Sequence, residues 1–249
     1  MTKILSTTGG PTQKEAKLPK VFSTEYRPDL IRKAYDAIAS HYRQPQGVDP
    51  AAGLKTSADY FGSRRNTYRQ TINKGMTRLP REKPGGGGLG KVRRIPQSVG
   101  GRAAHPPKPE KKLAKKINNK EYIQAIRSAI AATASRELVL SRNHKLDGVK
   151  EFPLIIEDKI QKTEKAKDLK KILESLGLAE ELKTSKNHKI LLAVGEDEGI
   201  RKAASNIPGI QISLVNELDL DILAPGAKAG VLTIWTESAL EKIDGVMGA

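Results

Sequence analysis

The segment Gly85–Lys91, within the stretch PGGGGLGKVRR, has the glycine and lysine spacing of a loop that binds phosphate. Gly85, Gly90 and Lys91 fit the pattern G-x-x-x-x-G-K, while Gly85, Gly87 and Gly90 fit G-x-G-x-x-G. In both kinds of loop, backbone N–H groups at the start of a helix bind the phosphates of a nucleotide. The first hypothesis is therefore a nucleotide-binding enzyme.

The residues on either side of these glycines do not provide the elements that such a loop needs. A buried strand should precede the loop, but Arg81–Pro84 contains no apolar run. Val92 stands where a Ser or Thr hydroxyl would bind Mg²⁺, and Pro96 prevents a helix of useful length after Lys91. The flanks favour a flexible glycine-rich loop. A P-loop-like or Mg²⁺-dependent α/β enzyme is kept as the alternative.

Other polar residues offer little support for catalysis or metal binding. The chain has no cysteine, and none of its four histidines pairs with another at i, i+4. Glu196–Glu198 follow an apolar run and could hold Mg²⁺, but acids in a first helical turn also stabilise the helix dipole. Glu217, Asp219 and Asp221 alternate with apolar residues, as in a loop or an edge strand. We therefore expect no enzyme, no cofactor and no metal site.

The positive charge of the chain is concentrated in one internal stretch. The net charge is +16, yet residues 55–120 hold 18 Lys or Arg and 3 acids, against 26 bases and 25 acids elsewhere. Such a stretch predicts a polyanionic partner, either nucleic acid or an anionic membrane surface. No run of about 18 apolar residues occurs, so the sequence predicts no membrane span.

This basic stretch also lacks the residues that build a hydrophobic core. No Phe, Trp or Tyr occurs between Tyr68 and Tyr122, and prolines and glycines interrupt any regular element. Because little apolar surface could offset the ordering entropy, we expect a binding element that orders on a polyanion. Tyr60, Phe61 and Tyr68 lie among arginines at its start, where they could stack on bases or anchor the loop.

The flanking residues show the alternation of an α/β fold. The apolar pattern predicts helices at 26–42, 117–140, 163–176, 196–205 and 236–243, and strands at 152–156, 189–195, 210–214 and 230–235. We expect a parallel-sheet globular domain with helices on both faces, formed by residues 1–43 and 119–249. A long extended basic loop, residues 44–118, interrupts it.

Several segments of the chain are similar to the archaeal and eukaryotic type of the large-subunit ribosomal protein L four family. The most specific are GLKTSADYFGSRR (53–65), RLPREKPGGGG (78–88), GGRAAHPP (100–107), SAIAATASRELVLSRNH (128–144) and FPLIIED (152–158). They occur in the family's order over nearly the whole chain. The chain ends soon after its last predicted helix, which favours the archaeal form.

The resemblance implies a structural and assembly role in the large ribosomal subunit of the cytoplasm. The expected partners are large-subunit (23S-type) rRNA and neighbouring ribosomal proteins, including L twenty-two near the nascent-peptide exit tunnel, with no membrane and no small-molecule substrate. A general nucleic-acid chaperone with a basic arm is a further alternative.

The resemblance also implies which residues contact RNA. The basic candidates are Arg64, Arg65, Arg69, Arg78, Arg81, Lys83, Lys91, Arg93, Arg94 and Arg102, to which we add Lys74 and Lys108 from the same stretch. The family's glycine run near the loop tip, which helps line the tunnel, corresponds to Gly85, Gly86, Gly87, Gly88, Leu89 and Gly90. Leu89 and Val92 stand where many relatives carry an aromatic residue, so no aromatic side chain is available for stacking there.

Overall fold

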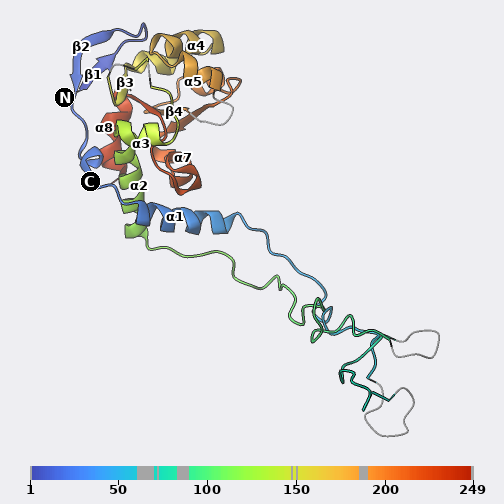
Figure 1. Cartoon of the computed structure of the whole chain (residues 1–249). Helices are drawn as coiled ribbons and strands as arrows, with labels where there is room; N and C mark the ends of the chain where they lie inside the picture. Colours follow the sequence, from blue (N-terminus) through green and yellow to red (C-terminus); the bar gives the residue numbers. More distant parts are fainter. Residues whose placement is uncertain are drawn as a thin grey trace. The chain divides into compact units, whose positions relative to one another are not determined.

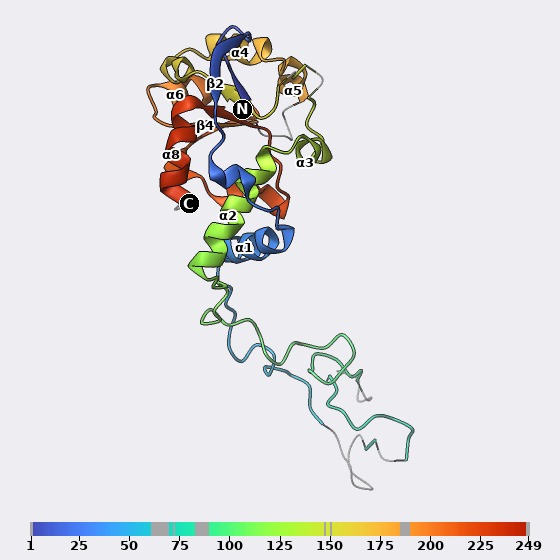
Figure 2. The same ribbon diagram turned by 90° about the vertical axis from the view of Figure 1, so that its left-hand side faces the viewer.

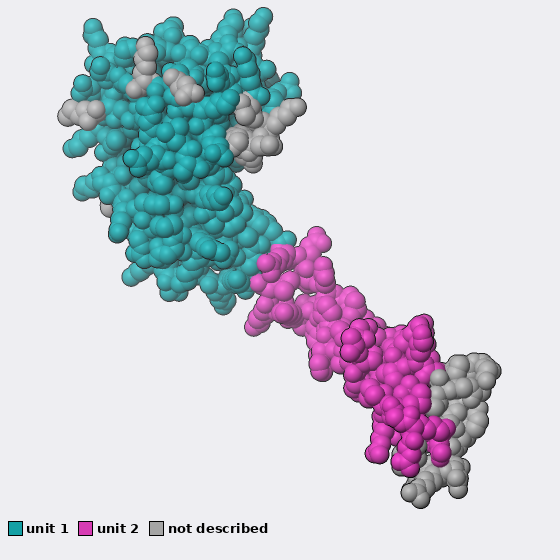
Figure 3. Space-filling view, in the orientation of Figure 1, with its two compact units in different colours: residues 1–42, 114–249 teal, residues 43–113 magenta. Residues whose placement is uncertain are grey.

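The computed structural model describes residues 2–60, 70–71, 73–82, 90–146, 148–149, 151–184 and 190–247 (Figure 1). The chain divides into two compact units, coloured separately in Figure 3. Residues 1–42 and 114–249 form the first, which we call the globular unit. Residues 43–113 form the second, which we call the basic unit.

A six-stranded sheet runs through the globular unit in the order β2-β1-β3-β6-β4-β5. The strands are β1 (Thr2–Leu5), β2 (Pro11–Ala16), β3 (Leu154–Ile156), β4 (Ile190–Val194), β5 (Ile210–Leu214) and β6 (Thr233–Thr236). β1 and β2 form an antiparallel hairpin, and every other neighbouring pair is parallel. The sheet is therefore mostly parallel, as the sequence predicts.

Helices connect the strands and pack on the sheet. The α-helices are α1 (Pro28–His41), α2 (Asn119–Thr133), α3 (Arg136–Ser141), α4 (Ala166–Ser175), α5 (Ala179–Thr184), α6 (Ile200–Ala204), α7 (Leu220–Leu223) and α8 (Glu237–Met247). Short 3-10 turns are η1 (Lys20–Ser23), η2 (Asp158–Lys162), η3 (Val215–Glu217) and η4 (Pro225–Ala227). Figures 1 and 2 show α1, α2 and α8 on the opposite side of the sheet from α4.

The two faces of the sheet bury two separate hydrophobic cores. Successive side chains of a strand point to opposite faces, so Ile155 and Trp235 enter one core while Leu154 and Ile156 enter the other. The first core includes residues of α1, α2, α7 and α8, and the second includes residues of α4 and α6. Burial on both faces explains why β3 and β4 are apolar throughout. The predicted α/β fold with helices on both faces is confirmed.

Most of the expected elements occur, with differences at their ends. The helix expected at 117–140 is divided at Ala134 and Ser135 into α2 and α3. The helix expected from Glu196 begins only at Ile200, after a loop that includes Gly199 with a φ of +118°. The β1–β2 hairpin and the short helices α5 and α7 are not predicted, because their sequences are polar or too short to show a period.

Specific residues terminate two of the helices. Thr236 caps α8, since its Oγ1 accepts a hydrogen bond from Ala239 N at 3.3 Å. Gly177 follows α4 with a φ of +83°, in the left-handed region that favours glycine. Leu178 N then donates to Leu173 O at 3.1 Å, which satisfies a carbonyl at the end of the helix.

Trp235 is the largest fully buried side chain of the first core, with 0% of its surface exposed. Its ring meets Phe22 edge to face, with 5.3 Å between ring centroids and an interplanar angle of 82°. The indole Nε1 is buried and has no hydrogen-bond partner among the described residues. Trp235 therefore stabilises the fold through its packing and not through its N–H group.

We expect Trp235→Ala to lower the free energy of unfolding by about 3–5 kcal/mol, because it leaves a large cavity. Trp235→Phe should cost less than half of that, since it keeps an aromatic ring and loses no hydrogen bond. Urea unfolding followed by circular dichroism measures both, because each variant removes the only tryptophan. Equal losses for the two variants would mean that the indole N–H has a partner.

A buried polar pair joins α5 to the loop after α3. His144 Nδ1 donates to Glu181 Oε1 at 2.7 Å, and both side chains are almost fully buried. Glu181 Oε2 accepts from Lys145 N at 2.9 Å, and His144 Nε2 accepts from Leu232 N at 3.4 Å. Each carboxylate oxygen therefore accepts a hydrogen bond, as a buried carboxylate requires.

We expect Glu181→Gln to lower the free energy of unfolding by about 1–3 kcal/mol, the usual cost of leaving a buried donor without an acceptor. The amide nitrogen that replaces one oxygen would face an N–H donor. Glu180→Gln is the matched control: Glu180 is exposed, lies 3.8 Å from Lys145 and should change stability by less than about 0.5 kcal/mol. Urea unfolding followed by Trp235 fluorescence measures the free energy of unfolding of both variants. Equal losses for Glu181→Gln and Glu180→Gln would contradict this account.

Candidate nucleic-acid interface

The carboxyl ends of the parallel strands are filled by the protein's own polar side chains. Enzymes with open α/β sheets bind their ligands at this edge. Here Gln161 Nε2 donates to Ser238 Oγ at 2.6 Å and to Asp158 Oδ1 at 2.9 Å. Asp158 Oδ1 also accepts from Ser238 N at 2.9 Å, and Gln161 Oε1 accepts from Glu196 N at 3.3 Å. The donors and acceptors at this edge are therefore largely occupied by one another.

The acids that could have held Mg²⁺ have partners within the fold. Glu196 lies 2.6 Å from Lys242 Nζ, and Asp197 lies 3.6 Å from Arg201. Asp197 also accepts a hydrogen bond from Gly199 N at 3.1 Å, and Asp219 caps α7 through Leu220 N. Within the described ranges, no group of three or more His, Asp or Glu side chains could hold a metal ion. Stabilisation of loops and helix ends accounts for these acids.

Hydrogen bonds join the two places in the globular unit where the chain leads into residues 43–113 and returns from them. His41, the last residue of α1, donates from Nε2 to Lys115 O at 3.1 Å. Lys115 N in turn donates to Ser40 Oγ at 2.8 Å. These bonds bring together two positions that are 75 residues apart in the sequence. The globular unit therefore holds both ends of the intervening segment.

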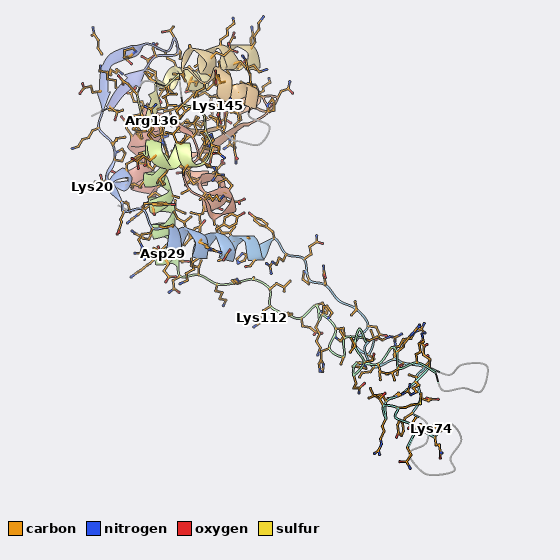
Figure 4. The ribbon with its side chains drawn as sticks, in the orientation of Figure 1. Lys20, Asp29, Lys74, Lys112, Arg136 and Lys145 are labelled. Atoms are coloured by element: carbon orange, nitrogen blue, oxygen red, sulfur yellow. The ribbon has the colours of Figure 1, made fainter. Side chains whose placement is uncertain are left out.

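The basic unit contains 16 Lys or Arg and 4 acids. Five of the predicted RNA-binding side chains are exposed and have no acid within ion-pair distance among the described residues: Lys74, Arg78, Lys91, Arg93 and Lys108. Figure 4 labels Lys74 together with Lys112, another exposed base of this unit. Exposed cations without an acidic partner are available to neutralise phosphates.

Two further predicted bases are exposed but make contacts within the basic unit. Arg94 Nε lies 3.1 Å from Glu82 Oε1. Arg102 donates from Nη1 to the carbonyl of Lys55. Four predicted bases, Arg64, Arg65, Arg69 and Lys83, and the glycine-segment residues Gly85, Gly86, Gly87, Gly88 and Leu89 lie outside the described residues.

Arg81 differs from the other described bases of this unit because only 7% of it is exposed. Its backbone exchanges two hydrogen bonds with Asp59, at 2.9 and 3.0 Å. Its guanidinium donates to Gly90 O at 3.1 Å and to both Thr77 O and Thr77 Oγ1 at 3.1 Å. We call these four residues, Asp59, Thr77, Arg81 and Gly90, the Arg81 cluster.

The described part of the basic unit has a small interior, which its composition does not predict. Ile95 and Thr71 are almost fully buried. Gly53 packs against backbone so closely that a Cβ there would lie 2.0 Å from Ala103 O, which only glycine tolerates. Counting aromatic and aliphatic residues misses this interior, because much of it consists of backbone groups and one guanidinium.

A groove of about 440 Å³ lies between the first and last residues of the basic unit. Its lining includes Arg43, Lys108 and Lys111 and no acid. Only Lys108 was predicted as a site residue. Arg43 lies just outside the predicted loop, and Lys111 is counted among the bases of the stretch but is not named as a site residue. Both line the same groove as Lys108, which makes them further candidates for phosphate binding.

Of the three aromatic residues at the start of the basic stretch, the structure describes Tyr60. Tyr60 is 44% exposed, so it is accessible to a stacking partner. Phe61 and Tyr68 lie outside the described residues.

Among the described helices, none combines the length and the apolar character that a membrane span requires.

Known proteins resemble this chain over nearly its whole length. The model of the ribosomal protein L4/L1 family matches residues 16–246. The chain is 38% identical to the large ribosomal subunit protein uL4 of Archaeoglobus fulgidus, with 96% of both chains covered. It is also 38% identical to the uL4 proteins of Methanocaldococcus jannaschii, with 98% of both covered, and of Methanosphaera stadtmanae, with 94% and 93% covered. The chain belongs to the ribosomal protein L4/L1 family.

Proposed function

We propose that this chain is a structural component of the large ribosomal subunit that binds large-subunit (23S-type) rRNA through its basic unit. The observation that carries the proposal is the set of five exposed bases without an acidic partner in the described residues of that unit. The excess of 16 bases over 4 acids between residues 43 and 113 supports it further. The name of the curated relatives, large ribosomal subunit protein, points to the same assembly.

Phosphate neutralisation is the physical basis of the proposed binding. A cation that meets a phosphate releases condensed counterions from the nucleic acid, which favours association. Arg78 and Arg93 can each bind a phosphate with two parallel hydrogen bonds, whereas Lys74, Lys91 and Lys108 act as point charges. The groove lined by Arg43, Lys108 and Lys111 is a further cationic surface, formed by the first and last residues of the basic unit.

The alternative of an α/β enzyme receives less support. The edge of the sheet where such enzymes bind ligands is filled by the Asp158, Gln161 and Ser238 network. A general nucleic-acid chaperone would use the same bases, but it would bind any RNA equally well. Competition between RNAs therefore distinguishes the chaperone from a ribosomal protein.

The proposal extends to the glycine-rich segment that ends at Gly90. Following the family resemblance, we place this segment beside the nascent-peptide exit tunnel, near ribosomal protein L twenty-two. Glycines allow backbone to pass close to RNA where a Cβ would clash.

Binding to large-subunit rRNA should weaken steeply as salt rises. Five phosphate contacts predict a slope of log affinity against log salt of about −3.5 to −4.5, from −0.7 to −0.9 for each contact. Arg78→Gln and Lys91→Gln should each make the slope less negative by about 0.7–0.9. Lys14→Gln is the control with the same change in net charge, since Lys14 belongs to the globular unit and lies 3.5 Å from Glu237.

Fluorescence anisotropy at several salt concentrations measures these slopes, with large-subunit rRNA fragments and unrelated RNA in competition. A slope near zero, or equal effects of Lys14→Gln and Arg78→Gln, argues against phosphate binding by the basic unit. Equal affinity for all RNAs indicates the general chaperone instead.

A photo-crosslinker placed at position 90 tests the tunnel placement. In ribosomes carrying a stalled nascent chain, we expect crosslinks from this position to the nascent chain or to ribosomal protein L twenty-two. The same crosslinker at position 170 on α4, in the globular unit, is the control and should give neither product. Nascent-chain crosslinks from position 170 alone contradict the placement.

A further inference from the structure

The family resemblance places Arg81 among the bases expected to contact RNA, but its surroundings in the structure differ from those of the exposed bases. It is buried, whereas Arg78, Lys91 and Arg93 nearby are exposed. A buried guanidinium loses its hydration, so it is stable only where the protein provides acceptors. The acceptors around Arg81 are carbonyl and hydroxyl oxygens of its own unit.

The guanidinium connects parts of the chain that are separated in sequence. Nη1 donates to Gly90 O, and Nη2 donates to Thr77 O and Thr77 Oγ1, all at 3.1 Å. The backbone of Arg81 pairs with Asp59 on the other side. One residue thus holds three other segments of the chain, at positions 59, 77 and 90.

We infer that Arg81 is a positioning residue that organises the basic unit and uses its charge inside the protein, so that it does not bind an RNA phosphate. The Arg81 cluster fixes the backbone from which Arg78 and Lys91, its neighbours in sequence, extend into solvent. Gly90, the residue that follows segment 83–89 in the sequence, belongs to the same cluster. In addition, Glu82 N donates to Lys91 O at 3.2 Å, and Arg94 binds Glu82.

Arginine suits this role better than lysine would. The guanidinium is a planar fork whose nitrogens donate in fixed, diverging directions, so it can reach Gly90 and Thr77 at once. A lysine has the same charge but a single nitrogen at the end of a flexible stem. Arg81→Lys therefore keeps the charge that RNA binding would use, while it removes the fork that the cluster needs.

Backbone hydrogen exchange in the free full-length protein tests the inference without RNA. We expect the amides of Asp59, Arg81 and Glu82 to be protected in the native chain, because each donates to a backbone carbonyl. Arg81→Lys and Arg81→Gln should each reduce this protection at least tenfold, and Arg78→Lys and Arg78→Gln are the matched controls. Trp235 fluorescence verifies that the globular unit is folded in every variant.

RNA binding provides the second measurement, and this part of the inference rests on the proposed function. Arg81→Lys should lower the affinity for large-subunit rRNA by about tenfold at fixed salt, because a less ordered unit must be ordered on binding. Neither Arg81→Lys nor Arg81→Gln should change the salt slope. Arg78→Gln should change the slope, while Arg78→Lys should change little.

The inference is overturned if Arg81→Lys leaves both amide protection and affinity unchanged. It is equally overturned if Arg81→Gln makes the salt slope less negative by one phosphate contact, as Arg78→Gln does. A failure of the proposed function gives another result. In that case no variant changes the slope of log affinity against log salt, while the protection of the three amides still depends on Arg81.

Discussion

Repulsion between like charges is the constraint on which the organisation of this chain depends. Residues 43–113 hold 16 bases and 4 acids, whereas the globular unit holds 28 bases and 24 acids. A segment with so large an excess of one charge opposes its own compaction unless a polyanion neutralises it. The apolar residues are accordingly concentrated in the globular unit, where both faces of the sheet are buried. The large hydrophobic cores and the excess of positive charge therefore lie in different units.

The α/β sheet has an architecture that in many enzymes carries a ligand at the carboxyl ends of the strands. In this chain that edge is closed by a network centred on Gln161, and the acids nearby pair with Lys242 and Arg201. Function therefore cannot be inferred from the fold alone. The hydrogen bonds of Lys115 to His41 and Ser40 suggest a different use of the sheet and its helices, as a support that holds both ends of the basic segment.

The sequence predicts β3 to β6, and most clearly β3 and β4, because strands buried on both faces are continuous apolar runs. The same rule misses the β1–β2 hairpin, since β2 is mostly polar and exposed. For the proposed site, charge identifies the basic stretch in the sequence but cannot distinguish a buried arginine from an exposed one. Arg81 and Arg78 look alike in the sequence, and only the structure shows that the carbonyls of Thr77 and Gly90 surround Arg81. Arg43 is missed for a related reason, because the other bases of the groove, Lys108 and Lys111, are far away in the sequence.

Crosslinking of the basic unit to RNA in assembled ribosomes tests the central claim most directly. A photo-crosslinker at position 78 or 91 of the full-length chain, followed by sequencing of the attached RNA, identifies what these exposed positions touch. The account predicts crosslinks at a few recurring sites in large-subunit rRNA, and far fewer from position 14 in β2. Crosslinks spread over unrelated RNAs without a recurring site, or no RNA crosslinks at positions 78 and 91, would contradict it.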